Sequence, residues 1–164
     1  MAQPIIEFKN FGFQYDAQAE PTLYNIDLAI QPGERVLIAG PSGSGKSTIA
    51  SCINGLIPFS YPGRCTGSLT VDGVDEPNAS IFELSKHVGT VLQDPDGQFI
   101  GLTVGEDIAF ALENQCVAQP EMKQTVERVA RLVDVENLLE QEPHALSGGQ
   151  KQRVSLAGVM VDDV

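Results

Sequence analysis

The stretch that decides the fold runs from Gly40 to Thr48 and reads GPSGSGKST, directly after the apolar run RVLIA. The spacing of Gly40, Gly45, Lys46 and Ser47 fits the pattern G-x-x-x-x-G-K-[ST] of loops that bind nucleotide phosphates. Glycines let the backbone curl so that successive N–H groups point toward an anion, and a following helix adds the positive end of its dipole. We therefore predict a phosphate-binding loop at residues 40–48.

The polar residues of this loop have distinct expected roles. Lys46 would place its charge on the β- and γ-phosphates of ATP, and the Ser47 hydroxyl would coordinate Mg²⁺. The alternative is a Gly/Ser-rich turn that happens to contain a lysine, which a strand before the loop and a helix after it disfavour. The residues expected to hold the nucleotide here are Gly40, Pro41, Ser42, Gly43, Ser44, Gly45, Lys46, Ser47 and Thr48.

Two segments before the loop predict strands with one buried face. Residues 7–15 (EFKNFGFQY) alternate with a phase slip near Lys9 and Asn10. Residues 23–30 (LYNIDLAI) alternate without interruption and are followed by the turn QPGE. The buried face of the second segment is predicted to carry Tyr24, Ile26, Leu28 and Ile30.

The segments flanking and following the loop complete an α/β pattern. Residues 35–39 (RVLIA) predict a strand buried on both faces, as in the middle of a parallel sheet. The spacing of Ile49 and Ile53 predicts a helix after the loop. Residues 67–73 (GSLTVDG) predict a strand closed by an Asp-Gly turn, and residues 87–93 (HVGTVLQ) predict another strand.

The pattern becomes helical from Thr103 onward. Thr103 and Glu106 have the spacing of a capping box, and Pro120 suits the start of a further helix. The apolar face of that helix is predicted to carry Met122, Val126, Val129 and Val133. Strands followed by helices indicate an α/β core with a helical subdomain.

A second glycine motif narrows the class of protein. Residues 146–150 (LSGGQ) resemble the signature motif of ABC ATPases. In that family, the signature of one subunit closes over the ATP held by the phosphate loop of its partner. A glycine-rich helix N-terminus and a serine hydroxyl can supply the donors for this contact. The resemblance implies nucleotide binding by Ser147, Gly148, Gly149 and Gln150.

Two further positions match the same family. Gln93 stands where ABC ATPases carry the Q-loop glutamine, which implies a catalytic role in sensing Mg²⁺ and the membrane partner. Tyr15 stands where the family places an aromatic ring that stacks on adenine. A core or rim tyrosine is the alternative for Tyr15, and Phe13 is an alternative stacking ring.

Residues 92–114 (LQDPDGQFIGLTVGEDIAFALEN) resemble the ATPases of energy-coupling factor importers, which take up vitamins and transition-metal ions. The resemblance implies ATP and Mg²⁺ as cofactors and a second ABC ATPase subunit, identical or related, as partner. It also implies a membrane coupling subunit that contacts Gln93 to Phe110, and a peripheral location at the cytoplasmic face of the membrane. A non-transport ABC ATPase and a nucleotide-binding fragment without turnover are the alternatives.

An ABC ATPase also needs an apolar Walker B strand that ends in Asp-Glu, and a later histidine at the γ-phosphate. Asp162 and Asp163 are too near the signature and are interpreted as a helix end, and neither His87 nor His144 stands at the expected position. We therefore expect an N-terminal portion of an ABC ATPase, truncated before the Walker B strand and inactive alone. Residues 1–92 would form the β subdomain and phosphate-loop core, and residues 93–164 the Q-loop, helical subdomain and signature helix.

Composition limits the remaining function classes. The 164 residues carry a net charge of −12, which disfavours nucleic acid and anionic lipid as general partners. Three cysteines without metal-ligand spacing are expected to be reduced thiols. The sequence shows no signal-peptide pattern and no apolar run long enough to span a bilayer.

Overall fold

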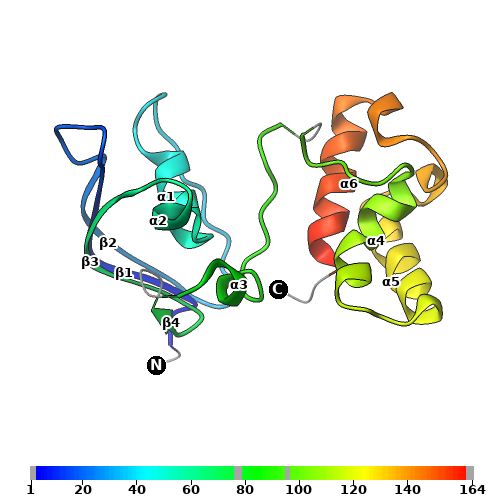
Figure 1. The fold of residues 1–164 in the computed structure, drawn as a ribbon, viewed down its shortest axis with the longest axis horizontal. Helices are drawn as coiled ribbons and strands as arrows, with labels where there is room; N and C mark the ends of the chain where they lie inside the picture. Colours follow the sequence, from blue (N-terminus) through cyan, green and yellow to red (C-terminus); the bar gives the residue numbers. More distant parts are fainter. Residues whose placement is uncertain (1–2, 76–78, 95–96, 162–164) are drawn as a thin grey trace. The chain divides into compact units, whose positions relative to one another are not determined.

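The computed structural model describes residues 3–75, 79–94 and 97–161. These residues divide into two compact units, residues 1–88 and 89–164 (Figure 1). Each unit has its own hydrophobic cluster, so each is described by itself.

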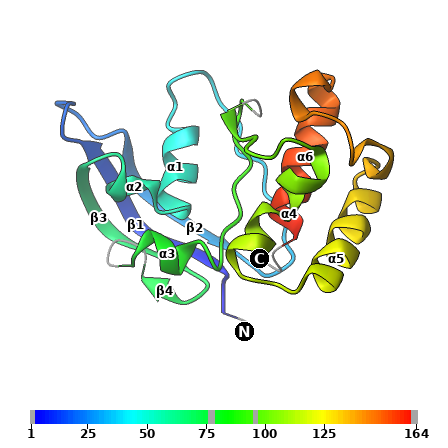
Figure 2. The ribbon, with the colours of Figure 1, turned by 45° about the vertical axis from the view of Figure 1, so that its right-hand side comes forward.

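The described residues of the first unit form a four-stranded antiparallel sheet and three short helices. The strand order is β2-β1-β3-β4, and Figure 2 shows α1 and α2 beside one face of this sheet. The sheet consists of β1 (Ile6–Tyr15), β2 (Leu23–Ile30), β3 (Gly63–Val71) and β4 (Val74–Asp75). The helices are α1 (Lys46–Ile53), α2 (Leu56–Phe59) and α3 (Ile81–Leu84).

The phase slip predicted in the first strand is confirmed. Asn10 has a left-handed φ of 45°, and the pairing of β1 with β3 shifts between Lys9 and Gly12. Such a bulge moves the alternation by one residue, so side chains on both sides of it reach the same core. Phe8, Phe11 and Phe13 are each at most 1% exposed.

The prediction for Tyr24 is wrong. Tyr24 is 71% exposed, whereas its neighbour Leu23 is 3% exposed. Asn25 has a φ of 51°, and the pairing of β1 with β2 shifts beside it. This irregularity reverses the alternation, so Leu23 enters the core while Ile26 on the other side of it stays half-buried.

Residues 35–39 and 87–93 do not form the predicted strands. Within the described part of the chain, neither segment has a β ladder, and Val36 and Leu37 are 43% and 89% exposed. A strand needs a hydrogen-bonded neighbour, and the four strands of the sheet pair with one another instead. The apolar runs are real, but apolar composition alone does not supply a partner strand.

The second unit is helical. Its helices are α4 (Val104–Asn114), α5 (Gln119–Leu132) and α6 (Gly148–Met160), with the 3₁₀ turns η3 (Glu136–Leu138) and η4 (Pro143–Ala145). The predicted face of α5 is confirmed, because Val126 and Val129 are buried in the cluster shared with α4 and α6. Val154, Ala157 and Val161 extend this cluster along the last helix, whereas Asp162 and Asp163 lie outside the described residues.

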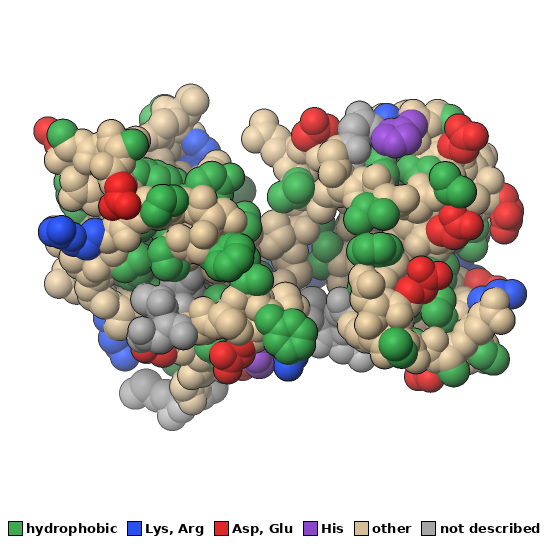
Figure 3. Space-filling view, viewed as in Figure 1, with side chains coloured by type: hydrophobic (Ala, Val, Ile, Leu, Met, Phe, Trp, Pro, Cys, Tyr) green, Lys and Arg blue, Asp and Glu red, His purple; other side chains and the backbone are tan. Residues whose placement is uncertain are grey.

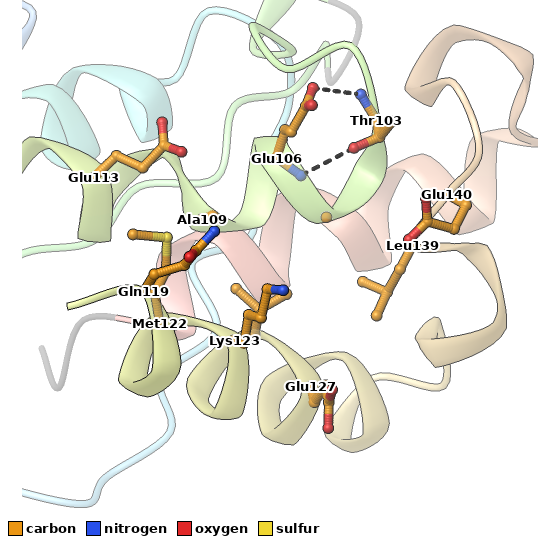
Figure 4. Close-up of a pocket in the computed structure, with 12 residues that line it drawn as sticks. Thr103, Glu106, Ala109, Glu113, Gln119, Met122, Lys123, Glu127, Leu139 and Glu140 are labelled. Atoms are coloured by element: carbon orange, nitrogen blue, oxygen red, sulfur yellow. Dashed lines mark hydrogen bonds between the residues drawn. The ribbon is translucent and has the colours of Figure 1, made fainter. Parts of the chain in front are cut away.

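The capping box predicted at the start of α4 is confirmed. Glu106 N–H donates to Thr103 Oγ1 over 3.2 Å, and Thr103 N–H donates to Glu106 Oε2 over 3.1 Å (Figure 4). The N–H groups of Val104 and Gly105 donate to carbonyls of Gln141 and Leu139. The first turn of α4 is therefore anchored both locally and to the segment before η4.

We expect Thr103→Ala to loosen this first turn. Loss of an N-cap side chain costs about 1 kcal/mol, so amide hydrogen exchange at the start of α4 should be about fivefold faster in the full-length protein. Thr103→Ser, which keeps the hydroxyl acceptor, serves as the matched control. Equal exchange in Thr103→Ala and wild type would contradict a stabilising cap.

Among the described residues, no helix is both long enough and apolar enough to cross a bilayer.

Candidate nucleotide-binding site

The predicted phosphate loop adopts a conformation that requires glycine. Gly43 and Gly45 have left-handed φ values of 80° and 86°, and Gly45 caps α1, which begins at Lys46. A Cβ on Gly45 would also lie 2.8 Å from Leu23 Cδ2. A side chain at Gly45 would therefore be strained by its own backbone and would collide with the core.

The loop presents unused backbone donors at the N-terminus of α1. The first bond of this helical turn runs from Ile49 N–H to Gly45 C=O, over 2.9 Å. The N–H groups of Lys46, Ser47 and Thr48 precede it, so they have no acceptor within the helix. Ser42, Ser44 and Ser47 are exposed. A nest of free donors at a positive helix end is what an anionic phosphate chain requires.

Lys46 folds back across the loop that it would serve. Its Nζ donates to the carbonyl oxygen of Pro41 over 2.7 Å. An anionic phosphate oxygen would bind the Lys46 ammonium more strongly than this neutral carbonyl does, because both partners would then be charged. The residues present therefore fit a triphosphate, with the exposed Ser47 hydroxyl as an available oxygen ligand for Mg²⁺.

Tyr15 lies next to the helix that follows the loop. Its hydroxyl is 3.2 Å from Thr48 Oγ1, and its ring meets the Phe13 ring edge-to-face at 4.7 Å between centroids. Phe13 is 1% exposed and has no free ring face, whereas Tyr15 is half-buried. Tyr15 is thus the ring that could meet a base, and Thr48, at 7% exposure, contributes its hydroxyl to the fold.

The signature motif forms the start of α6. Ser147 directs both its N–H and its hydroxyl to Gln150 Oε1, each over 2.9 Å. Gly148 and Gly149 are exposed, and a Cβ built on either would meet no atom within 4 Å among the described residues. The helix therefore does not need these glycines for its own packing. Their N–H groups stand at the open end of the helix, where an external acceptor can reach them.

Gln93 is exposed and opens a segment whose shape is set by two later residues. Gln98 Oε1 accepts from Leu92 N–H over 3.1 Å. Asp107 Oδ1 accepts from the N–H groups of Ile100 and Gly101 over 2.8 and 3.1 Å. The carboxylate of Asp107 therefore fixes how this segment approaches α4.

The same segment divides its apolar side chains between core and surface. Phe99 packs against the helical cluster and meets the His144 ring at 6.0 Å between centroids, so its ring is engaged within the second unit. Ile100 and Leu102 are 66% and 80% exposed.

His87, in the first unit, pairs through Nδ1 with Asp72 Oδ2 at 2.8 Å.

The structure brings some predicted residues together and leaves others in separate units. Tyr15 and the loop belong to residues 1–88, whereas Gln93 and the signature belong to residues 89–164. Sequence reasoning missed Asp107, whose bonds reach back six and seven residues and leave no periodic pattern. It also missed Ser155, a buried polar residue on the same helix as the buried Val154 and Ala157, which its place beside this apolar stripe could have indicated.

The chain belongs to the ABC transporter family, because the model of that family, described as ABC transporter, matches residues 23–164. A protein of Clostridium perfringens, provisionally named an ABC transporter ATP-binding protein, is 64% identical over 98% of this chain. A protein of the same description from Streptococcus mutans is 63% identical over 98%. The chain spans only 28% and 29% of the length of these two relatives.

A solved structure extends the likeness to three dimensions. The structure of cbiO1 from Clostridium perfringens, described as part of the ABC transporter complex cbiONQ, matches with a TM-score of 0.88 and 29% identity. It is matched over 99% of this chain and 63% of its own. The predicted fold class is thereby confirmed: an α/β phosphate-loop NTPase core with an antiparallel β subdomain, joined to the helical subdomain of ABC ATPases.

Proposed function

We propose that the full-length protein is the ATP-hydrolysing subunit that energises an importer of the energy-coupling factor type, which takes up vitamins or transition-metal ions. The proposal that the protein binds ATP rests on the loop at residues 40–48. This loop has left-handed glycines and N–H donors that the helix α1 does not use. The likeness to cbiO1, described as part of a transporter complex, supports the importer part.

The roles proposed for individual residues follow from their surroundings. Backbone N–H groups of residues 40–48 and the Lys46 ammonium bind the phosphates, and Tyr15 stacks on the adenine. Mg²⁺, held through Ser47, would neutralise charge on the phosphates. Gln93 has the proposed role of the Q-loop glutamine of the family. The signature residues Ser147 and Gly149 offer donors to a nucleotide held by a second ABC ATPase subunit.

The proposed membrane contact is the segment from Gln93 to Phe110. Ile100 and Leu102 present apolar side chains to solvent, and the bonds to Asp107 hold the backbone between them and α4 in one shape. Exposed apolar groups on a fixed backbone suit docking by a cytosolic helix of a membrane subunit. This contact would place the protein at the cytoplasmic face of the membrane.

We expect full-length protein carrying Leu102→Cys to cross-link to a membrane subunit in the assembled transporter. The exposed native Cys116 is replaced by serine in all variants. Gln124→Cys, exposed on α5, is the matched control and should give little or no such adduct. Equal adducts from positions 102 and 124, or none from position 102, would contradict the docking assignment.

The nucleotide assignment is tested by itself with the full-length protein. Titration with ATP in the presence of Mg²⁺ should show saturable binding, and phosphate release should show hydrolysis. Binding without hydrolysis would indicate a nucleotide-binding module. Hydrolysis without any associated membrane subunit in the cell would indicate a non-transport ABC ATPase.

A further inference from the structure

A small pocket on the second unit contains a buried hydroxyl that has no hydrogen-bond partner in the described part of the chain. The pocket has a volume of about 170 Å³ and lies among the Gln93–Phe110 segment, α4 and α6. Ser155, on α6, is 6% exposed, and no hydrogen bond reaches its Oγ among the described residues. A buried hydroxyl without a partner is costly, so it marks a place where a ligand group can bind.

The surroundings of Ser155 define the chemistry of that group. The Asp107 carboxylate lines the same pocket, and among the described residues only its Oδ1 accepts hydrogen bonds, from the N–H groups of Ile100 and Gly101. A carboxylate accepts but does not donate, and a serine hydroxyl can accept. Phe110, 40% exposed, adds an aromatic ring at the rim. Two acceptors beside an aromatic ring favour a cationic group with N–H donors.

The larger cleft between α4 and α5 offers no comparable signal. Its volume is about 500 Å³, but the glutamates that line it are exposed to water (Figure 4). The basic group is therefore better placed beside Ser155. Acidic side chains are also spread over the face of this unit seen in Figure 3, which favours the approach of a basic partner.

We infer that Ser155 and Asp107 together receive the basic end of a side chain from the docking partner, so that docking acts directly on α6. This inference rests on the proposed function, because it takes the partner to be the membrane subunit that docks on residues 93–110. Docking is thereby linked to the signature motif. Ser155 sits on the helix whose N-terminus is the signature motif, two turns from Gly148. A bond to Ser155 would bias the position of that helix when the partner is bound.

The test uses the full-length protein and two small probes, n-propylguanidinium and its neutral analogue n-propylurea. Ligand-observed NMR should show propylguanidinium binding at least about fivefold tighter than propylurea, because only the first carries the charge that Asp107 pairs with. Ser155→Ala should weaken propylguanidinium binding about fivefold, the usual effect of one lost hydrogen bond.

A second variant fills the pocket instead of removing a hydrogen-bonding group from it. Gly158 lines the pocket, and a Cβ built there meets no described atom within 4 Å, so Gly158→Leu can be accommodated while occupying the space. Leucine also favours a helix more than glycine does, so the fold should be kept. Gly158→Leu should abolish probe binding. Gln152→Leu, exposed on the same helix, should leave it unchanged.

The effect of docking on α6 is measured as ATP hydrolysis in the assembled transporter. Ser155→Ala should reduce the stimulation of hydrolysis by the membrane subunit severalfold while leaving basal hydrolysis and ATP affinity unchanged. Probe binding that is equal in wild type, Ser155→Ala and Gly158→Leu would overturn the pocket, even where ATP binds and is hydrolysed. Full stimulation in Ser155→Ala would overturn the link to α6. Absence of ATP binding in wild type would instead overturn the proposed function.

Discussion

Gly149→Asp in the full-length protein is expected to cut steady-state ATP hydrolysis by at least about 100-fold while changing the ATP affinity of the monomer by no more than a few-fold. The new carboxylate would face the phosphate held by the opposing subunit. Two like charges about 4 Å apart at an effective dielectric of about 20 repel by about 4 kcal/mol, which is ample for such a loss. Monomer binding should be spared because, in the proposed arrangement, the donors of the signature serve a nucleotide on the other subunit.

The surroundings of Gly149 indicate that this variant keeps its fold, so a loss of hydrolysis can be assigned to the signature motif. A side chain at Gly149 meets no described atom within 4 Å, and an acidic residue in the first turn of a helix is favourable, so α6 should remain folded. Gln152→Glu changes the charge of the same helix by the same amount at an exposed position and serves as the control. ATP binding and hydrolysis that fall in parallel in Gly149→Asp would place the motif in its own subunit's site.

Lys46→Ala is the second change with a large expected effect. It should weaken ATP binding about 100-fold or more, because it removes a charged donor from the β- and γ-phosphates, and bonds to charged groups are among the strongest in proteins. In the structure, Lys46 Nζ donates to the Pro41 carbonyl, a contact within the loop and not with the hydrophobic cluster. The fold should therefore survive.

Circular dichroism and ATP titration of the full-length protein separate these two effects. Lys86→Ala removes one positive charge from the same unit, where Lys86 lies over the Phe82 ring, and should leave ATP affinity within about twofold. If Lys46→Ala bound ATP as tightly as the control, residues 40–48 would not be a phosphate-binding loop.

The features that the sequence predicted correctly all depend on neighbours in the chain. The capping box at Thr103 needs only Glu106, three residues away, and the bulge at Asn10 shows in the spacing of the phenylalanines around it. The amphipathic face of α5 follows from the helical period, and Val126 and Val129 are buried as that period requires. Each is set by backbone dihedral angles and contacts within one or two turns.

The wrong predictions depend on which other segment of the chain lies alongside. Val36 and Leu37 belong to an apolar run that suits a buried strand, yet no strand pairs with it among the described residues. Tyr24 and Leu23 are adjacent and both suit a core, and the left-handed Asn25 decided which of them faces inward. Neither choice can be derived from composition or period.

By itself, therefore, the sequence determined the phosphate loop, its helix and the signature turn, because glycine spacing and short-range hydrogen bonds set their geometry. Only the tertiary structure decided that the hydroxyls of Thr48 and Tyr15 are hydrogen-bonded to each other and that Phe99 is packed while Ile100 is exposed. It also decided that the Ser155 hydroxyl is buried with no partner among the described residues. The physical reason is that burial and hydrogen-bond satisfaction depend on atoms brought together from distant parts of the chain.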